Sequence, residues 1–220
     1  DVVAVGALLG IVNGKESSST TTNKTKNEEN HSSETSTIAS KKTDDKKNKK
    51  NNLKKKRIKK LDIKINKMIN LISDSQKPVI IAGNGIHISK SKGQFYKFIN
   101  KLKCPVITSW NGSDLINFNN QQHVGRMGLF GDRASNLTAQ NSDLLIVLGS
   151  RLSVPQIGYI TKDFAKHSNK IIIDKDKNEL NRNFLSKIKL KFNCDLKIFL
   201  SKSNEKLNKI KKKYDFSKWL

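Results

Sequence analysis

The chain has 220 residues, enough for one ordinary domain with tails, and its hydrophobic share of 35% is low for a chain that folds along its whole length. It carries 43 Lys and Arg against 19 Asp and Glu, a formal net charge of +24. Because this excess is spread along the chain, without zinc-finger spacing or an aromatic-rich basic strand, we interpret it as drift in composition rather than as a nucleic-acid surface.

The first residues do not show the pattern of a core. Residues 1–14 are apolar from Val2 to Val12, too short to span a bilayer, and we interpret them as the unplaced end of a preceding domain. Residues 15–56 are rich in Lys, Asn, Ser and Thr and predict a disordered linker, whose lysine run Lys41–Lys60 we interpret as solvated. The chain begins at Asp1, so we expect an excerpt of a longer protein, with residues 215–220 starting a linker to a further domain.

Residues 57–214 alternate between two hydrophobic periods. Apolar residues three and four apart predict a helix from Ile58 to Ser75, and the continuous apolar run Val79–Ala82 predicts a buried strand. The elements predicted next are a helix from about residue 89 to 102, a strand over 104–109, a loop over 110–131, a helix over 132–140, a strand over 143–149, a helix over 159–167, strands over 170–174 and 187–192, and a final helix over 196–214. This alternation predicts an α/β fold, a Rossmann-like parallel sheet of five to six strands with helices on both faces.

Polar and glycine residues follow four of the predicted strands, at the edge where α/β sheets bind ligands. Glycines let a ligand approach the backbone, Arg151 can grip a phosphate, and a strand-end acid can accept from ribose hydroxyls. We expect a phosphate to meet the first N–H groups of the helix after Gly85. The four groups are Gly83-Asn84-Gly85, Thr108-Ser109, Gly149-Ser150-Arg151 and Asp174-Lys175-Asp176. A purely structural role for the glycines stays open.

The residues by themselves predict no reaction. His87 and His123 have no Ser or Cys at a strand-to-helix turn to pair with, and no cluster has the spacing of a metal site. We therefore predict no catalytic residue and no metal ligand in this segment. The two cysteines, Cys104 and Cys194, lie far apart, which argues against a disulfide framework and favours a reducing compartment, the cytoplasm or an organelle of a eukaryote with an AT-rich genome.

Five segments, taken together and in order, resemble the central domain of thiamine-diphosphate-dependent enzymes. Within that group the sequence is most similar to acetolactate synthase large subunits, and the resemblance extends from about Leu61 to Leu200. The segments are Pro78–Ile86, Cys104–Trp110, Gly125–Asn136, Asn141–Leu152 and Ile171–Leu180.

The resemblance implies one part of a three-domain transferase of branched-chain amino acid biosynthesis. Such an enzyme decarboxylates a 2-oxoacid such as pyruvate and transfers the two-carbon unit to a second 2-oxoacid. Thiamine diphosphate and Mg²⁺ would be held by domains outside this segment, which has neither the activating glutamate's domain nor the Gly-Asp-Gly…Asn metal motif, so this segment should not catalyse the reaction alone. The expected partners are the other domains of the parent chain and further copies, in a dimer or tetramer, with no membrane and no nucleic acid.

The resemblance also assigns cofactor-binding positions. In the branch that binds FAD these positions line the flavin nucleotide, whereas in other branches the domain is structural and its crevice is empty or closed. The matching residues are Gly83, Asn84, Gly85, Thr108, Gly128, Gly131, Arg151, Asp174 and Asp195. Four alternatives remain open: a non-catalytic flavin or nucleotide module of the same fold, another thiamine-diphosphate decarboxylase or lyase, an NAD-consuming deacylase with a zinc module, and a basic nucleic-acid-associated protein.

Overall fold

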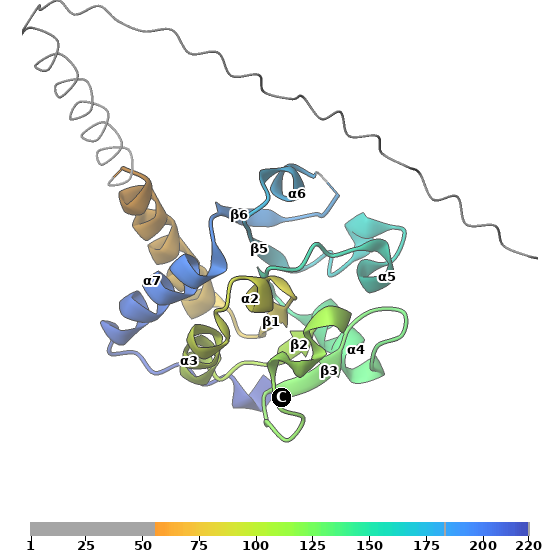
Figure 1. Cartoon of the computed structure of the whole chain (residues 1–220). Helices are drawn as coiled ribbons and strands as arrows, with labels where there is room; N and C mark the ends of the chain where they lie inside the picture. Colours follow the sequence, from red (N-terminus) through yellow and green to blue (C-terminus); the bar gives the residue numbers. More distant parts are fainter. Residues whose placement is uncertain (1–55, 183, 220) are drawn as a thin grey trace, which may run out of the picture. The chain divides into compact units, whose positions relative to one another are not determined.

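The computed structural model of the chain describes residues 56–182 and 184–219, and Figure 1 shows the arrangement of their elements. The apolar segment over 1–14 and the linker predicted over 15–56, except for residue 56, lie outside the described residues. The strands are β1 (Pro78–Ala82), β2 (Val106–Thr108), β3 (His123–Arg126), β4 (Leu144–Leu148), β5 (Asn169–Asp174) and β6 (Ile188–Asn193). The helices are a first helix over residues 56–74, then α2 (Gly85–Ile88), α3 (Lys92–Leu102), α4 (Arg133–Asn141), α5 (Val154–Ile157), α6 (Lys177–Asn181) and α7 (Leu196–Asn208), with 3₁₀ turns η1 (Trp110–Leu115), η2 (Thr161–Asp163) and η3 (Ser217–Trp219).

The six strands form one sheet in the order β3-β2-β1-β4-β5-β6, and each neighbouring pair is parallel. The chain starts in the middle at β1, moves outward to β3, returns to the middle at β4 and moves outward again to β6. The strand order therefore reverses between β1 and β4, which is where open α/β sheets place their ligand crevice. The predicted α/β fold with a parallel sheet of five to six strands is confirmed.

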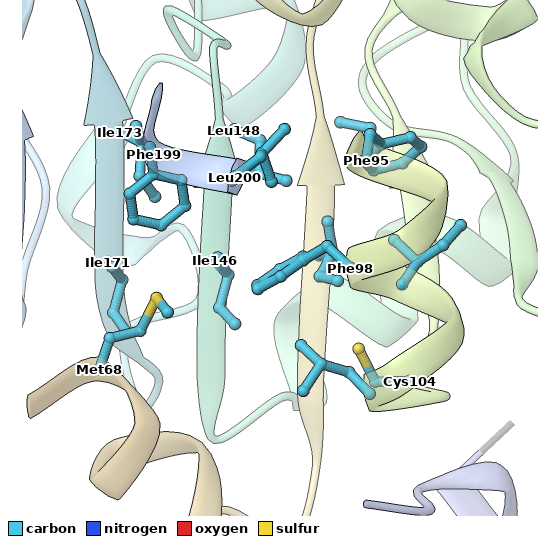
Figure 2. Close-up of a cluster of buried hydrophobic side chains, with 14 of the residues drawn as sticks. Met68, Phe95, Phe98, Cys104, Ile146, Leu148, Ile171, Ile173, Phe199 and Leu200 are labelled. Atoms are coloured by element: carbon cyan, nitrogen blue, oxygen red, sulfur yellow. The ribbon is translucent and has the colours of Figure 1, made fainter. Parts of the chain in front are cut away.

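Helices cover both faces of the sheet because successive strand residues point to opposite sides. On one face Ile80, Ile146 and Ile171 pack against the first helix, α3 and α7. Figure 2 shows this layer, with Met68 near Ile171, Phe199 near Ile173, and Phe98 reaching from α3 over β1. On the other face Val79, Ile81, Leu145 and Val147 pack against α4, α5 and α6. All five positions of β1 and of β4 are buried, which explains why both strands are continuous apolar runs.

Three element predictions are wrong. The loop predicted from Trp110 to Gly131 contains η1 and the edge strand β3, whose four residues include a single large apolar side chain. The helix predicted over residues 159–167 is only the short turn η2, and Tyr159 is 92% exposed. The final helix ends at Asn208, although Tyr214 beyond it is buried and its hydroxyl lies 2.9 Å from Ser73 Oγ.

The C-terminal residues stay close to the sheet. Phe216 is partly buried against the hydrophobic side chains on the α3 and α7 face of the sheet, and Trp219 against those on the opposite face. Lys77 Nζ lies 5.1 Å from the centre of the Trp219 ring. Both cysteines are free thiols. Burial raises the pKa of Cys104 to about 12 and that of Cys194 to about 11, so both are protonated near neutral pH. No described helix is long and apolar enough to cross a bilayer.

A fully buried lysine in β5 predicts a specific pH dependence of stability. Lys170 Nζ donates to the carbonyl oxygens of Ala165 (2.8 Å) and Ser168 (3.1 Å), and burial, with Lys187 nearby, lowers the pKa of Lys170 from 10.5 to about 8. Between these values the folded chain has released a proton that the unfolded chain keeps, so folding stability rises with pH in that window, by up to about 3 kcal/mol.

The measurement is urea unfolding at several pH values between 7.5 and 10.5, roughly the span of the two pKa values, with Lys170→Met beside the wild type. Other groups also titrate in this range, so the informative quantity is the difference between the two chains. The wild type should gain stability relative to Lys170→Met as the pH rises. Parallel curves would contradict the lowered pKa.

Candidate functional site

A cavity of about 790 Å³ opens at the carboxyl edge of the sheet, above the point where β1 and β4 lie side by side. This volume is in the range of small-molecule and cofactor sites. Its lining comes from the segments after β1, β2, β4, β5 and β6 and from the loop between β3 and α4. The lining residues are Asn84, Gly85, Ile88, Ser89, Ser109, Trp110, Asn111, Met127, Leu129, Phe130, Gly149, Ser150, Arg151, Ser153, Pro155, Gln156, Asp174, Lys175, Asp195 and Leu196.

Three glycines let the ends of β1 and β4 meet beneath this cavity. A Cβ on Gly83 would lie 2.3 Å from the carbonyl oxygen of Gly149, and a Cβ on Gly85 would lie 2.8 Å from Gly149 Cα. Gly149 itself has φ +60°. The backbones are joined by hydrogen bonds from Gly83 N to Leu148 O (2.9 Å) and from Gly85 N to Gly149 O (3.0 Å). These glycines are therefore required by the contact between two strand ends.

Backbone hydrogen bonds occupy the N–H groups that were expected to meet a phosphate at the start of the helix. Besides Gly83 and Gly85, Ile86 N donates to Gly83 O and His87 N donates to Asn84 O. These four N–H groups are occupied by the protein, and α2 has only four residues, so its dipole is small. At this turn, a ligand phosphate would have to be held mainly by side chains.

Arg151 follows β4 and is the arginine that lines the cavity. Its side chain is 70% exposed, and its Nε lies 3.8 Å from Glu179 Oε1 on α6. Glu179 is more buried, and its other oxygen accepts a hydrogen bond from Arg182 Nη1 at 2.8 Å. Arg151 is thus a largely exposed cation at the cavity, paired with Glu179 on one side and suited to a phosphate or carboxylate.

Two acids lie at the ends of β5 and β6, on the cavity side. Asp174 Oδ1 accepts from the backbone N of Asp176 (2.8 Å), and Asp195 Oδ1 accepts from the backbone N of Lys197 (2.8 Å) at the start of α7. Each carboxylate uses one oxygen to shape its own turn, and both residues line the cavity. The remaining carboxylate oxygens of these two acids can accept hydrogen bonds from ligand hydroxyls.

Aromatic and aliphatic side chains from the segments after β2 and β3 line the other side of the cavity, away from the acids that follow β5 and β6. The rings of Trp110 and Phe130 meet edge to face with centroids 5.5 Å apart, and they are 58% and 68% exposed. Leu129 and Ile88, both more than three-quarters exposed, also line the cavity, together with the buried side chains of Met127 and Leu196. Such rings offer a planar ligand group an apolar contact.

The loop that carries Phe130 is fixed by its backbone contacts. Asn136 forms hydrogen bonds with both backbone groups of Gly128: its Oδ1 accepts from Gly128 N (2.9 Å), and its Nδ2 donates to Gly128 O (3.0 Å). Leu129 N donates to Pro155 O at 2.8 Å, which ties the loop to the segment after β4. Asp132 begins α4 as predicted, but its carboxylate accepts from the backbone N of Arg126 at 2.8 Å instead of from the helix.

The structure brings together five of the nine predicted site residues. Asn84, Gly85, Arg151, Asp174 and Asp195 line the cavity. The other four support its walls: Gly83 contacts Gly149, Thr108 is fully buried with its hydroxyl donating to Gly125 O at 3.4 Å, and Gly128 and Gly131 shape the loop before α4. Their assignment as cofactor-binding residues stays a prediction.

Neither histidine considered as an acid or base lines the cavity. His87 Nε2 lies 2.9 Å from Asp114 Oδ1, and this contact, which ties α2 to η1, lowers the pKa of Asp114. His123 meets Phe118 edge to face, and burial lowers its pKa. Among the residues that the structure describes, no group of three or more His, Cys, Asp or Glu side chains could hold a metal ion.

Fold and sequence together define the class of protein. Residues 65–202 match the family described as "Thiamine pyrophosphate enzyme, central domain". The chain therefore belongs to this family and carries its central domain.

Relatives of this chain carry more than one name. It is 34% identical over 120 residues to a probable acetolactate synthase large subunit of Methanococcus aeolicus, which covers 54% of this chain and 20% of that protein. It is 32% identical over 162 residues to the acetolactate synthase large subunit of Lactococcus lactis, covering 74% of this chain and 27% of that protein. A 3D-(3,5/4)-trihydroxycyclohexane-1,2-dione hydrolase of Clostridium botulinum is 30% identical over 115 residues, covering 47% and 18%. The match spans about a fifth to a quarter of the length of these relatives.

Proposed function

We propose that the cavity at the β1–β4 junction is a nucleotide site within an acetolactate-synthase-like enzyme. The observation that carries the proposal is the convergence of Arg151, Asp174 and Asp195 on one cavity at the point where the strand order reverses. A cation for a diphosphate and two acids for ribose hydroxyls, placed at a switch point, are what a nucleotide needs.

FAD is the nucleotide that these residues fit best. With about 790 Å³, the cavity is large enough for a ligand with two ring systems. Its acids follow β5 and β6, whereas Trp110 and Phe130 follow β2 and β3 on the other half of the sheet. Arg151 would hold the diphosphate, Asp174 and Asp195 the ribose side, and the two aromatic rings the flavin. The task proposed for FAD here is to fix the loops that surround the cavity.

For the parent enzyme we propose decarboxylation of a 2-oxoacid such as pyruvate and transfer of the two-carbon unit to a second 2-oxoacid. Thiamine diphosphate would supply the stabilisation of the carbanion, and Mg²⁺ would hold its diphosphate, both on domains outside this segment. The domain described here would position those domains within a homo-oligomer. The match to the Clostridium botulinum hydrolase, which is named for a cyclic 1,2-dione, supports a second candidate, another thiamine-diphosphate-dependent reaction.

The test is calorimetric titration of the full chain with FAD and with ADP, which shares the adenosine diphosphate but has no flavin. We expect saturable binding of both, tighter for FAD, and a loss of about tenfold or more in affinity in Arg151→Met, since a hydrogen bond to a charged group is removed. Arg133→Met, an exposed arginine on α4 that does not line the cavity, is the matched control and should bind as the wild type.

Absence of binding by the wild type, or equal affinity of Arg151→Met and wild type, would contradict the proposed site. Thiamine diphosphate with Mg²⁺, titrated in the same way, should not bind to this segment. Saturable binding of that pair would contradict its assignment to other domains.

A further inference from the structure

Four side chains form a connected row beside the cavity. Arg182 lies over the ring of Phe184, with its Cζ 4.3 Å from the ring centre, and its Nη1 donates to Glu179 at 2.8 Å. Glu179 then faces Arg151 Nε at 3.8 Å. Its side chain is 20% exposed, against 70% for Arg151. Glu179 is therefore a carboxylate held in place on one side and facing a freer arginine on the other.

The atom that faces Glu179 matters chemically. An arginine has five N–H donors arranged as a fork, and a phosphate is gripped best by two parallel bonds. Glu179 approaches the Nε side of Arg151, so the Nη1 and Nη2 groups stay available to a ligand. Ordering a long side chain on binding costs free energy, and an ion pair that restricts the arginine before the ligand arrives lowers that cost.

We propose that Glu179 is a positioning residue that orients Arg151 for the ligand diphosphate. Glu179 does not line the cavity, so it acts through Arg151 and not on the ligand. Arg182 and Phe184 keep the Glu179 carboxylate in place. This inference rests on the proposed nucleotide site and adds to it the residue that prepares the phosphate grip.

A competing role predicts the opposite sign. If Glu179 acted only as a negative charge near the site, replacing it with glutamine would make the cavity more positive and would tighten the binding of an anion. If it orients Arg151, the same change should weaken binding, because the ion pair that holds the guanidinium is lost. The sign of the effect separates the two roles.

The experiment is titration of ADP into the full chain and into Glu179→Gln, Arg151→Met and the double variant. We expect Glu179→Gln to weaken ADP binding about three- to tenfold, as loss of orientation would, and to have no further effect once Arg151 is methionine. Glu205→Gln is the matched control: it makes the same change of charge on α7, where Glu205 pairs with Lys202 and Lys209, and it should not weaken binding.

The outcomes separate this inference from the proposed site. Tighter binding in Glu179→Gln, unchanged binding, or the same weakening in the Arg151→Met background would each overturn the positioning role. If Arg151→Met itself binds ADP as the wild type does, the proposed nucleotide site fails as well. A thermal melt of each variant without ligand shows whether any loss comes from unfolding.

Discussion

Replacing Gly83 with alanine is expected to cost about 3 kcal/mol or more of folding stability, the upper part of the range for overpacking. The new Cβ would lie 2.3 Å from the carbonyl oxygen and 2.6 Å from the carbonyl carbon of Gly149. Both are backbone atoms directly after the central strand β4, so they cannot move aside as a flexible side chain could. Urea unfolding followed by circular dichroism measures the loss, and a chain too unstable to purify agrees with the expectation.

Gly93→Ala is the matched control for this change. Gly93 lies in α3, is exposed, and has no atom within 4 Å of an added Cβ. The same substitution there should stabilise the helix by about 0.5–1 kcal/mol, because alanine loses less backbone entropy than glycine. A loss below about 1 kcal/mol in Gly83→Ala would show that the strand ends can separate easily.

Phe199→Ala is expected to destabilise the fold by about 3–5 kcal/mol. The Phe199 ring is fully buried and meets the rings of Phe192 and Phe98 edge to face, with centroids 4.9 and 6.5 Å away. Its removal would leave a cavity between α7 and the sheet, beside Ile173 in Figure 2.

The neighbouring residue on α7 provides the comparison. Ile198 is 54% exposed, so Ile198→Ala removes a similar apolar side chain from the outer side of the same helix. Its effect should stay within about 0.5 kcal/mol. Equal losses in the two variants, measured by urea unfolding, would contradict the packing described for α7.

The strands that could be predicted are those with a clear apolar pattern: β1, β2, β4 and β5 are short, largely buried runs, and the edge strand β6 alternates apolar and polar residues. Val79–Ala82 and Leu144–Leu148 are apolar at every position, and such runs have few other interpretations. β3 could not be predicted in this way, because an edge strand of four residues buries little and its sequence is His-Val-Gly-Arg. In place of the helix expected over residues 159–167, the chain forms η2, turns to an extended backbone at Phe164 and to a left-handed one at Ala165 (φ +44°), which apolar spacing does not reveal.

Whether a strand could be predicted also decides which residues of the site could be predicted. Arg151, Asp174 and Asp195 follow strands that the sequence reveals, and parallel strand ends meet at one edge, so their convergence could be predicted. Trp110 and Phe130 were missed because their contact requires β3 to lie beside β2, and β3 itself was not predicted. The role of Glu179 depends on a distance between α6 and the segment after β4, for which the sequence carries no signal.

The position of the cavity over the β1–β4 pair has a thermodynamic consequence. Its lining belongs to both halves of the sheet, β3-β2-β1 and β4-β5-β6, which meet only along this pair. A molecule bound there contacts both halves of the sheet. At a concentration of a hundred times its Kd, it adds about 2.7 kcal/mol to the free energy needed to separate the two halves. Amide hydrogens of β1 and β4 would then exchange with solvent more slowly, so occupancy could be followed from the protein backbone alone.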